Sequence, residues 1–231
     1  MQIDYLGHSE FLVETETALL LFDYYRGALS FLEKKPKEKP LFVFVSHAHA
    51  DHFNPFIFKI GGRNVTYLLS FDLKGSPKVK KDRDVRYLDA DRTYVVEGLG
   101  TVETLLSTDE GVAFLVKTSD KTLFHAGDLH WWDWPGEDPA WLLEQEAVFK
   151  REIGRLIDTP IDAAFAVLDD RLEENYTEGL SYLLSVLQVR YVLPMHFWKD
   201  KTAVGRFQAL PIAKTLDAVI LDTAHETHWE I

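Results

Sequence analysis

The stretch Leu41-Phe-Val-Phe-Val-Ser-His-Ala-His-Ala-Asp-His52 places three of the chain's nine histidines and an aspartate directly after a continuous apolar run. The run, Leu41–Val45, consists of branched aliphatic and aromatic residues behind Pro40, a pattern typical of a buried strand. The histidines therefore begin where a rigid strand ends and a loop opens, which is a common place for a catalytic metal site. The alternative is a helix N-terminus capped by Asp51, with surface histidines around it.

The spacing of these side chains predicts two metal positions rather than one. His47 and His49 are two residues apart, so in an extended backbone their rings project from the same side and can share an ion. Asp51 and His52 lie beyond the bend and would face a neighbouring position. Imidazole and carboxylate ligands suit zinc, with manganese or iron as alternatives, and the chain has no cysteine to build a sulfur site.

The stretch matches His-x-His-x-Asp-His and resembles the signature of the metallo-β-lactamase superfamily. Near the N-terminus, Gly7-His8-Ser9 and an apolar strand over residues 18–22 that ends at Asp23 resemble the opening of superfamily hydrolases of the ascorbate-phosphate-lactonase type. The resemblance implies that Asp23 orients a ligating imidazole. Without the resemblance, the sequence is equally consistent with Asp23 as a turn residue. His8 is expected to be structural.

Two later strand ends supply further candidate ligands. Leu123-Phe-His-Ala-Gly-Asp128 delivers a carboxylate after a glycine that permits a sharp turn. Asp128 resembles the superfamily aspartate that bridges two cations about 3.5–4 Å apart, and His196, after Leu193-Pro-Met, resembles its late metal-binding histidine. The expected metal ligands are therefore His47, His49, Asp51, His52, Asp128 and His196, and Asp51 and His52 are also expected to act in catalysis.

One ligand of the superfamily pattern is missing from the sequence. A histidine is expected just before the strand 111–116, but Ser107 occupies the aligned position. A serine hydroxyl is a poor zinc ligand compared with imidazole. Either the first metal binds weakly, or Asp109, Glu110 or His130 replaces the imidazole, or the protein is mononuclear at the second position. We expect a site that still binds metal, but unequally.

Composition and charge narrow the class of protein. The 231 residues are 46% hydrophobic, enough for a sizeable core, and no apolar run approaches the roughly 20 residues that span a bilayer. A formal charge of -12 disfavours a broad nucleic-acid footprint, which needs clustered lysine and arginine. The N-terminus begins directly with strand-like sequence and shows no signal peptide, so a cytoplasmic location is expected.

The pattern of strands and helices predicts one domain over residues 1–231. Short strand patterns dominate the first 125 residues, and the second half alternates strands with helices, the longest an amphipathic helix over residues 139–157. No Gly/Ser linker divides the chain. Two mixed sheets packed together with helices outside suit this order, so the predicted fold is α/β (α+β), an αββα sandwich with the metallo-β-lactamase fold.

Aromatic side chains follow the expected bridging aspartate. His130-Trp-Trp-Asp-Trp134 would lie beside the mouth of the site, where it could stack on a sugar, a lactone ring or a base. Alternatively, at least two of these tryptophans pack against the following helix or a partner subunit. Lys199, Lys201 or Arg26 could attract an anionic group, although such residues are more often simply solvated side chains.

These expectations combine into a predicted function. The chain is expected to be a hydrolase that uses metal-bound hydroxide on a small-molecule ester, lactone or phosphoester, with one or two zinc ions as cofactor. No membrane partner is expected, nucleic acid is disfavoured, and a homo-oligomer is left open. The alternatives are a degenerate metal-binding or scaffold protein without turnover, and a metal-dependent nuclease or phosphodiesterase.

Overall fold

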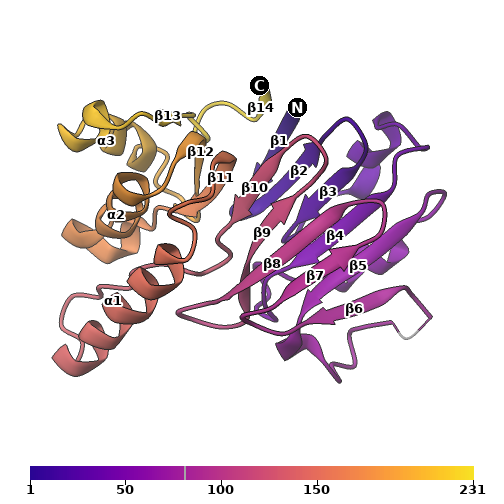
Figure 1. The fold of residues 1–231 in the computed structure, drawn as a ribbon, viewed down its shortest axis with the longest axis horizontal. Helices are drawn as coiled ribbons and strands as arrows, with labels where there is room; N and C mark the ends of the chain where they lie inside the picture. Colours follow the sequence, from indigo (N-terminus) through magenta and orange to yellow (C-terminus); the bar gives the residue numbers. More distant parts are fainter. Residues whose placement is uncertain (81) are drawn as a thin grey trace.

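The computed structural model describes residues 1–80 and 82–231 and contains two seven-stranded sheets packed face to face (Figure 1). The first sheet has the order β14-β1-β2-β3-β4-β5-β6 and the second the order β13-β12-β11-β10-β9-β8-β7. The strands of the first sheet are β1 (Gln2–Gly7), β2 (Glu10–Glu14), β3 (Leu19–Phe22), β4 (Leu41–Val45), β5 (Val65–Ser70), β6 (Val85–Leu88) and β14 (His228–Glu230). Those of the second are β7 (Thr93–Val96), β8 (Gly100–Leu106), β9 (Val112–Lys117), β10 (Thr122–His125), β11 (Ile161–Val167), β12 (Val189–Met195) and β13 (Val219–Ile220).

The two sheets share one topology, which brings their functional edges together. In the first sheet β14, β1, β2 and β3 pair antiparallel, and β3, β4, β5 and β6 pair parallel. In the second sheet β7, β8, β9 and β10 pair antiparallel, and β10, β11, β12 and β13 pair parallel. The carboxyl ends of parallel strands meet at one edge of a sheet, where α/β proteins bind their ligands. The segments predicted to carry ligands follow β4, β10 and β12.

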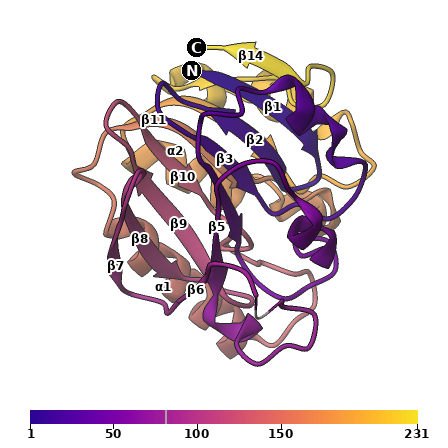
Figure 2. The ribbon, with the colours of Figure 1, turned by 90° about the vertical axis from the view of Figure 1, so that its right-hand side faces the viewer.

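The connections differ between the sheets. The second sheet is covered by three α-helices, α1 (Pro139–Gly154), α2 (Glu178–Val186) and α3 (Ala203–Ala209), which gather on one side of it (Figure 1). In Figure 2, α1 and α2 lie behind the strands of this sheet. The remaining helical connections are 3-10 turns, η1 (Leu29–Lys34), η2 (Pro55–Lys59), η3 (Phe71–Leu73), η4 (Asp170–Asn175) and η5 (Ile212–Thr215). The turn η2 is capped by the side chain of Asn54, which accepts the backbone N–H of Phe56. None of the helices in the described ranges is long and apolar enough to span a bilayer.

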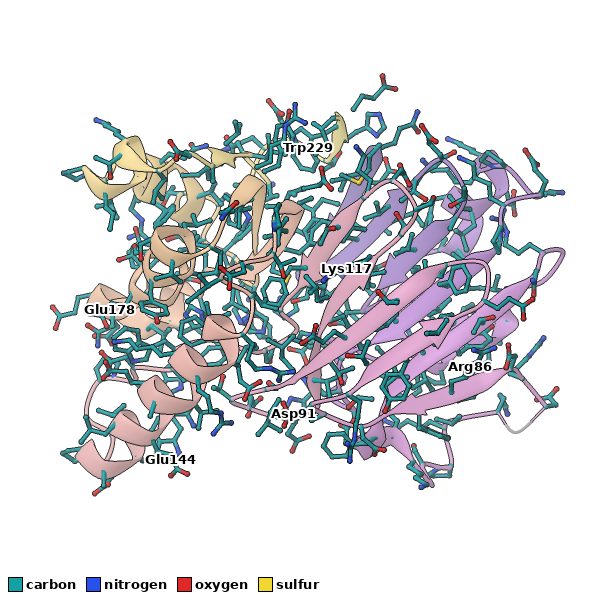
Figure 3. All side chains as sticks on the ribbon, viewed as in Figure 1. Arg86, Asp91, Lys117, Glu144, Glu178 and Trp229 are labelled. Atoms are coloured by element: carbon teal, nitrogen blue, oxygen red, sulfur yellow. The ribbon has the colours of Figure 1, made fainter. Side chains whose placement is uncertain are left out.

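The longest helix marks the outer boundary of the second sheet. It begins at the Asp138 cap and Pro139, and it ends at Gly154, three residues before the expected Ile157. Glu144 on this helix points away from the sheets (Figure 3). Near the other end of the helix, Arg155 pairs with Asp91 and Glu103, which ties the helix to the β7–β8 region.

The main apolar core lies between the two sheets. Phe11 of β2 packs on Phe165 of β11 with ring centroids 4.4 Å apart, and Phe44 of β4 packs on Phe114 of β9 at 5.2 Å. These aromatic pairs join the sheets directly. The same cluster of buried residues continues into all three α-helices. The αββα sandwich is thereby confirmed, and the single-domain interpretation stays a prediction that this shared core supports.

Candidate metal centre

Strand ends from both sheets carry the candidate site. The loop 46–52 follows β4, Asp128 follows β10 and His196 follows β12. Asp23 and Asp169, which lie after β3 and β11, reach the same region from the two sheets. Because these strands are buried in the core, their ends hold the side chains on a rigid frame.

Two glycines let the backbone close around the histidine loop. Gly127 has a φ of 52°, and a Cβ there would stand 2.6 Å from the Cβ of Ser46. Gly111 has a φ of 68°, and its Cβ would stand 2.0 Å from the Ser46 carbonyl oxygen. Both conformations lie in the left-handed region that glycine adopts without a steric cost. Close approach at these points positions Asp128 and the start of β9 against the loop.

The first cluster of candidate ligands is open to solvent on one side. It contains His47, His49, Asp109 and Asp128, whose candidate ligand atoms all lie within 4.8 Å of one another. His47 Nε2 is 3.0 Å from His49 Nδ1 and 3.7 Å from Asp128 Oδ2. His47 and Asp128 are buried, whereas the side chains of His49 and Asp109 are each 45% exposed. Burial lowers the pKa of His47 to about 4, which keeps this imidazole neutral and available as a ligand at neutral pH.

The second cluster is more deeply buried. It contains His8, Asp51, His52 and His196, again with candidate ligand atoms within 4.8 Å of one another. His8 Nε2 lies 3.3 Å from Asp51 Oδ2. Asp128 Oδ1 lies 3.2 Å from His52 Nε2 and 3.4 Å from His196 Nε2, while its Oδ2 faces the first cluster. Asp128 thus stands between the two clusters, in the place expected for a bridging carboxylate.

Buried carboxylates orient two histidines of the second cluster. Asp23 Oδ2 is 2.8 Å from His52 Nδ1, and Asp23 also accepts hydrogen bonds from the backbone and hydroxyl of Ser46, each at 2.7 Å. Asp169 Oδ2 is 2.9 Å from His196 Nδ1. Each contact directs the opposite ring nitrogen toward Asp128, which is how an outer carboxylate fixes a ligating imidazole.

The electrostatics of these contacts favour ionised carboxylates. Burial alone would raise the pKa of Asp23, but the contact with His52 outweighs it and the pKa is lowered. Burial likewise opposes ionisation of Asp169, yet the contacts with His196 and Arg171 hold its pKa well below the usual range. Both side chains therefore carry negative charge at neutral pH and favour cationic groups nearby.

Buried nitrogen and oxygen atoms without hydrogen-bond partners indicate whether the site suits a metal ion. Within the described residues, four such atoms converge on the space around Asp128 without a hydrogen-bond partner; they are His8 Nε2, His52 Nε2, His196 Nε2 and Asp128 Oδ1. Buried polar atoms are normally paired because an unmade hydrogen bond costs about 1–3 kcal/mol. Imidazole nitrogen and carboxylate oxygen are the atoms that divalent transition metals take. The ligand atoms present therefore fit such ions.

The structure shows what stands where the missing histidine was expected. The Ser107 hydroxyl accepts the backbone N–H of Asp109 at 3.2 Å and so closes a turn. The turn brings the Asp109 carboxylate into the first cluster, with Oδ2 3.6 Å from His49 Nδ1. Glu110 Oε2 lies 3.5 Å from His49 Nε2, outside the four-residue cluster. His130 is buried against Gly179 and does not belong to either cluster of the described residues.

All six residues predicted as ligands lie in the two clusters; they are His47, His49, Asp51, His52, Asp128 and His196. Their role as ligands stays a prediction. Sequence reasoning expected His8 to be structural, whereas the structure places it against Asp51. It also missed Asp169, although the strand-end sequence Leu168-Asp-Asp170 resembles the setting of Asp23 and could have suggested it.

A small pocket opens onto the clusters. Its volume is about 260 Å³, and its floor is formed by residues of the two clusters. Four tryptophans and one arginine form the rest of the lining; they are Trp132, Trp134, Trp141, Trp198 and Arg171. Trp132 and Trp134 confirm the expectation of aromatic side chains at the mouth. The cations expected there, Lys199, Lys201 and Arg26, do not line it, and Arg171 does.

Comparison with known proteins identifies the family. The profile of the β-lactamase superfamily domain matches residues 2–133, which is more than half of the chain. The chain belongs to this superfamily and is a hydrolase of its metallo-β-lactamase fold class. The resemblance seen in the sequence is thereby confirmed.

Relatives along most of the chain are named metal-dependent hydrolases. A UPF0173 metal-dependent hydrolase from Opitutus terrae is 27% identical over 214 residues, which cover 85% of this chain and 85% of the relative. One from Pyrococcus abyssi is 24% identical over 208 residues, covering 85% of this chain and 84% of the relative. This chain is accordingly a metal-dependent hydrolase of the superfamily.

Solved structures share the fold. Igni18, a metallo hydrolase from Ignicoccus hospitalis, aligns with a TM-score of 0.67 and 16% identity over 100% of this chain and 98% of that chain. Zinc-bound PqqB from Methylobacterium extorquens aligns with a TM-score of 0.60 and 12% identity over 100% of both chains. At these identities the likeness concerns the arrangement of the two sheets and says nothing of the substrate.

Proposed function

We propose that this protein binds two divalent cations, with zinc as the physiological metal, and hydrolyses an ester, lactone or phosphoester bond of a small molecule. The observation that carries the proposal is the convergence of buried, unpartnered imidazole nitrogens on Asp128. A mixture of imidazole and carboxylate ligands without sulfur suits zinc best, with manganese or iron as alternatives.

Each cluster of side chains would hold one ion. The first position is assigned to His47, His49 and Asp109, and the second to Asp51, His52 and His196, with Asp128 shared between them. His8 lies beside the second position, in contact with Asp51. When bound, such cations polarise a carbonyl or phosphoryl oxygen and acidify a coordinated water.

The chain's own residues would organise the reaction around those ions. The ring nitrogens of His52 face Asp23 and Asp128, and we assign this side chain to holding the ion at the second position. Asp51 lines the pocket, and the contact of its carboxylate with His8, 3.3 Å away, keeps its pKa well below the usual range. A carboxylate of such low basicity orients a water molecule better than it removes a proton, and we assign Asp51 that orienting role.

The pocket favours a small substrate. Its volume of about 260 Å³ lies just below the usual range of ligand sites, and four tryptophans line it. A nucleic-acid strand needs a track of basic side chains for its phosphates. Among the described residues that line the pocket, Arg171 is the only lysine or arginine. This lining favours a small-molecule hydrolase over a nuclease.

Metal content and turnover test the proposal together. The protein would be stripped with a chelator, reloaded with zinc, manganese or iron, and analysed for metal per chain. Each form would then be tested on aryl esters, lactones and phosphodiesters. We expect close to two metals per chain and turnover that disappears on stripping and returns on reloading. Two bound metals without turnover on any substrate would support a non-catalytic metal-binding protein, and failure to bind metal would exclude the proposal.

A further inference from the structure

We propose that Arg171 is the specificity-determining residue of this site and that it holds the negatively charged oxygens of a small planar substrate. The proposal rests on the hydrolase function above and adds the substrate class: a compact ester with a flat ring and an oxyanion group such as a carboxylate. Its basis is the geometry of Arg171 within the pocket, together with the tryptophans that surround it.

Arg171 is fixed by one edge of its guanidinium and free on another. Its Nε lies 2.9 and 3.0 Å from the two carboxylate oxygens of Asp169, and its Nη2 lies 2.5 Å from Oδ2. The side chain is 45% exposed, and within residues 1–80 and 82–231 its Nη1 has no hydrogen-bond partner. A guanidinium has five N–H donors. The edge formed by Nη1 and Nη2 can therefore still receive a second carboxylate in a paired contact.

Two tryptophan rings lie within cation–π distance of the guanidinium. The Arg171 Cζ is 5.3 Å from the ring centroid of Trp134 and 4.9 Å from that of Trp198. Stacking on aromatic rings lowers the freedom of the side chain and reduces its hydration, both of which favour binding of an oxyanion. Arg171 is thus presented to the pocket in a fixed orientation.

Two of the tryptophans that line the pocket provide a flat surface for a ring. Trp132 and Trp134 are parallel, with an interplanar angle of 3° and centroids 5.8 Å apart, and Trp132 also contacts the His196 ring at 5.9 Å. The indole N–H of Trp132 donates to the backbone oxygen of Asp128 at 3.1 Å. This hydrogen bond locks the aromatic wall to the metal centre, so a ring placed on it would bring a neighbouring bond to the clusters.

The backbone around Trp198 is consistent with a functional position. His196 has a φ of 69° and Trp198 a φ of 46°, so two bulky residues in one loop are in the left-handed region. Such conformations are strained for residues that have a side chain, and they gather at ligand sites. The turn places the Trp198 ring 4.6 Å from the ring of His8 and beside Arg171, while 46% of the residue stays exposed.

Charge explains why one arginine would decide the substrate. The chain carries a net charge of -12, and the pocket floor contains carboxylates of both clusters. Within the described lining, Arg171 is the only lysine or arginine, so an anionic substrate has one place at which protein side chains compensate its charge. The distance between this cation and the metal centre across a small pocket restricts the substrate to a compact molecule.

A matched pair of substrates tests the proposal. The metal-loaded protein would be assayed with 4-acetoxybenzoate and with its methyl ester, which carry the same scissile acetate and differ only in the charge at the far end of the ring. We expect higher kcat/KM for the anion. Arg171→Gln should lower kcat/KM for 4-acetoxybenzoate by about 10- to 100-fold, the loss expected for hydrogen bonds to a charged group. The methyl ester should change far less, and Arg171→Lys should restore part of the preference.

Controls separate recognition from an indirect effect through Asp169 and His196. Lys199→Gln removes an exposed cation close to the pocket and should leave the preference intact. Metal content per chain should be equal in wild type and Arg171→Gln. Equal losses for both substrates in Arg171→Gln, or the absence of a preference in the wild type, would overturn the assignment of Arg171 as the anion-binding residue.

Binding without turnover distinguishes the two proposals. Titration of the metal-loaded protein with 4-hydroxybenzoate and its methyl ester can be followed by tryptophan fluorescence. Arg171-dependent binding of the anion without hydrolysis of either ester would support the pocket assignment and argue against the hydrolytic function. Hydrolysis of both esters without any charge preference would support the hydrolytic function and argue against the pocket assignment. If the protein neither binds the anion nor hydrolyses either ester, both proposals are overturned.

Discussion

The two ligand clusters on either side of Asp128 are built differently. In the buried cluster, His52 and His196 are each held by a carboxylate on the far side of the ring, at 2.8 and 2.9 Å. In the open cluster, His49 and Asp109 are each 45% exposed, and their closest contact with each other is 3.6 Å. The buried arrangement is fixed before any ion binds, whereas the open arrangement depends on side chains that water can reach.

This difference predicts unequal metal affinity. Ligands held in place by outer hydrogen bonds lose little freedom on binding an ion, and their partners raise their basicity. Exposed ligands must be ordered at the moment of binding, which costs side-chain entropy. We therefore expect the buried cluster to retain its metal in dilute chelator under conditions that empty the open one.

The largest effect is expected at the residue that the two clusters share. Asp128→Asn removes the charge between His47, His52 and His196 and should weaken metal binding at both positions. The loss should exceed the roughly 10- to 100-fold that removal of an outer partner causes. Elemental analysis after dialysis would show less than one metal per chain. Retention of two metals would mean that Asp128 does not bridge, and Asp120→Asn, in the turn between β9 and β10 and outside both clusters, serves as the control.

Removal of an outer carboxylate should separate the clusters. Asp169→Asn leaves all proposed ligands in place but weakens the orientation of His196, so affinity at the buried position should fall by about 10- to 100-fold. The open position should change little. Competition with a chromophoric chelator resolves the two binding steps, and an equal loss at both steps would contradict the assignment of Asp169 to one cluster.

A smaller effect is expected on the open side. Asp109→Asn should lower affinity at the first position by about tenfold, the lower end of the range for a single lost partner, because that position is already loosely held. Glu110→Gln is the matched control, since Glu110 lies 3.5 Å from His49 but outside the cluster. If the Glu110 variant loses the metal instead, Glu110 is the carboxylate that replaces the missing histidine. The same chelator competition measures both.

The smallest effect is expected from restoring the missing imidazole. Ser107→His places the superfamily ligand type beside Asp109 and should tighten the open position by no more than a few-fold, because the carboxylate already occupies this role. Metal content should stay near two per chain. A rise from one metal to two would show instead that the wild-type open cluster is empty and that Asp109 does not substitute.

Strand-based reasoning predicted residues that the structure brings together, because these candidate ligands follow strongly patterned strands. The apolar runs before His47 and Asp128 are β4 and β10, and all six predicted ligands lie in the two clusters. Local pattern gave no signal for the contacts of His8 and Asp169. Their importance comes from contacts with Asp51 and His196, which are 43 and 27 positions away in the chain, and such contacts leave no periodic signal.

Arg171 is a second example of a residue whose place in the site the local sequence does not predict. The sequence offered Lys199, Lys201 and Arg26 as cations near expected ligands, and none of them lines the pocket. Arg171 lies in the short turn η4 (Asp170–Asn175), where nothing in the local sequence sets it apart. Only its contacts with Asp169, Trp134 and Trp198 reveal its orientation.

The amino-acid sequence alone determined the class of this protein, the order of its strands and helices, and the side chains with metal-binding chemistry. These properties depend on periodicity and on short motifs, which are local. The tertiary structure decided how the candidate ligands are grouped, which carboxylate joins the open cluster, and which cation faces the pocket. Those properties arise where the ends of strands from two sheets meet, and the packing of β3, β4, β10, β11 and β12 sets the distances between them.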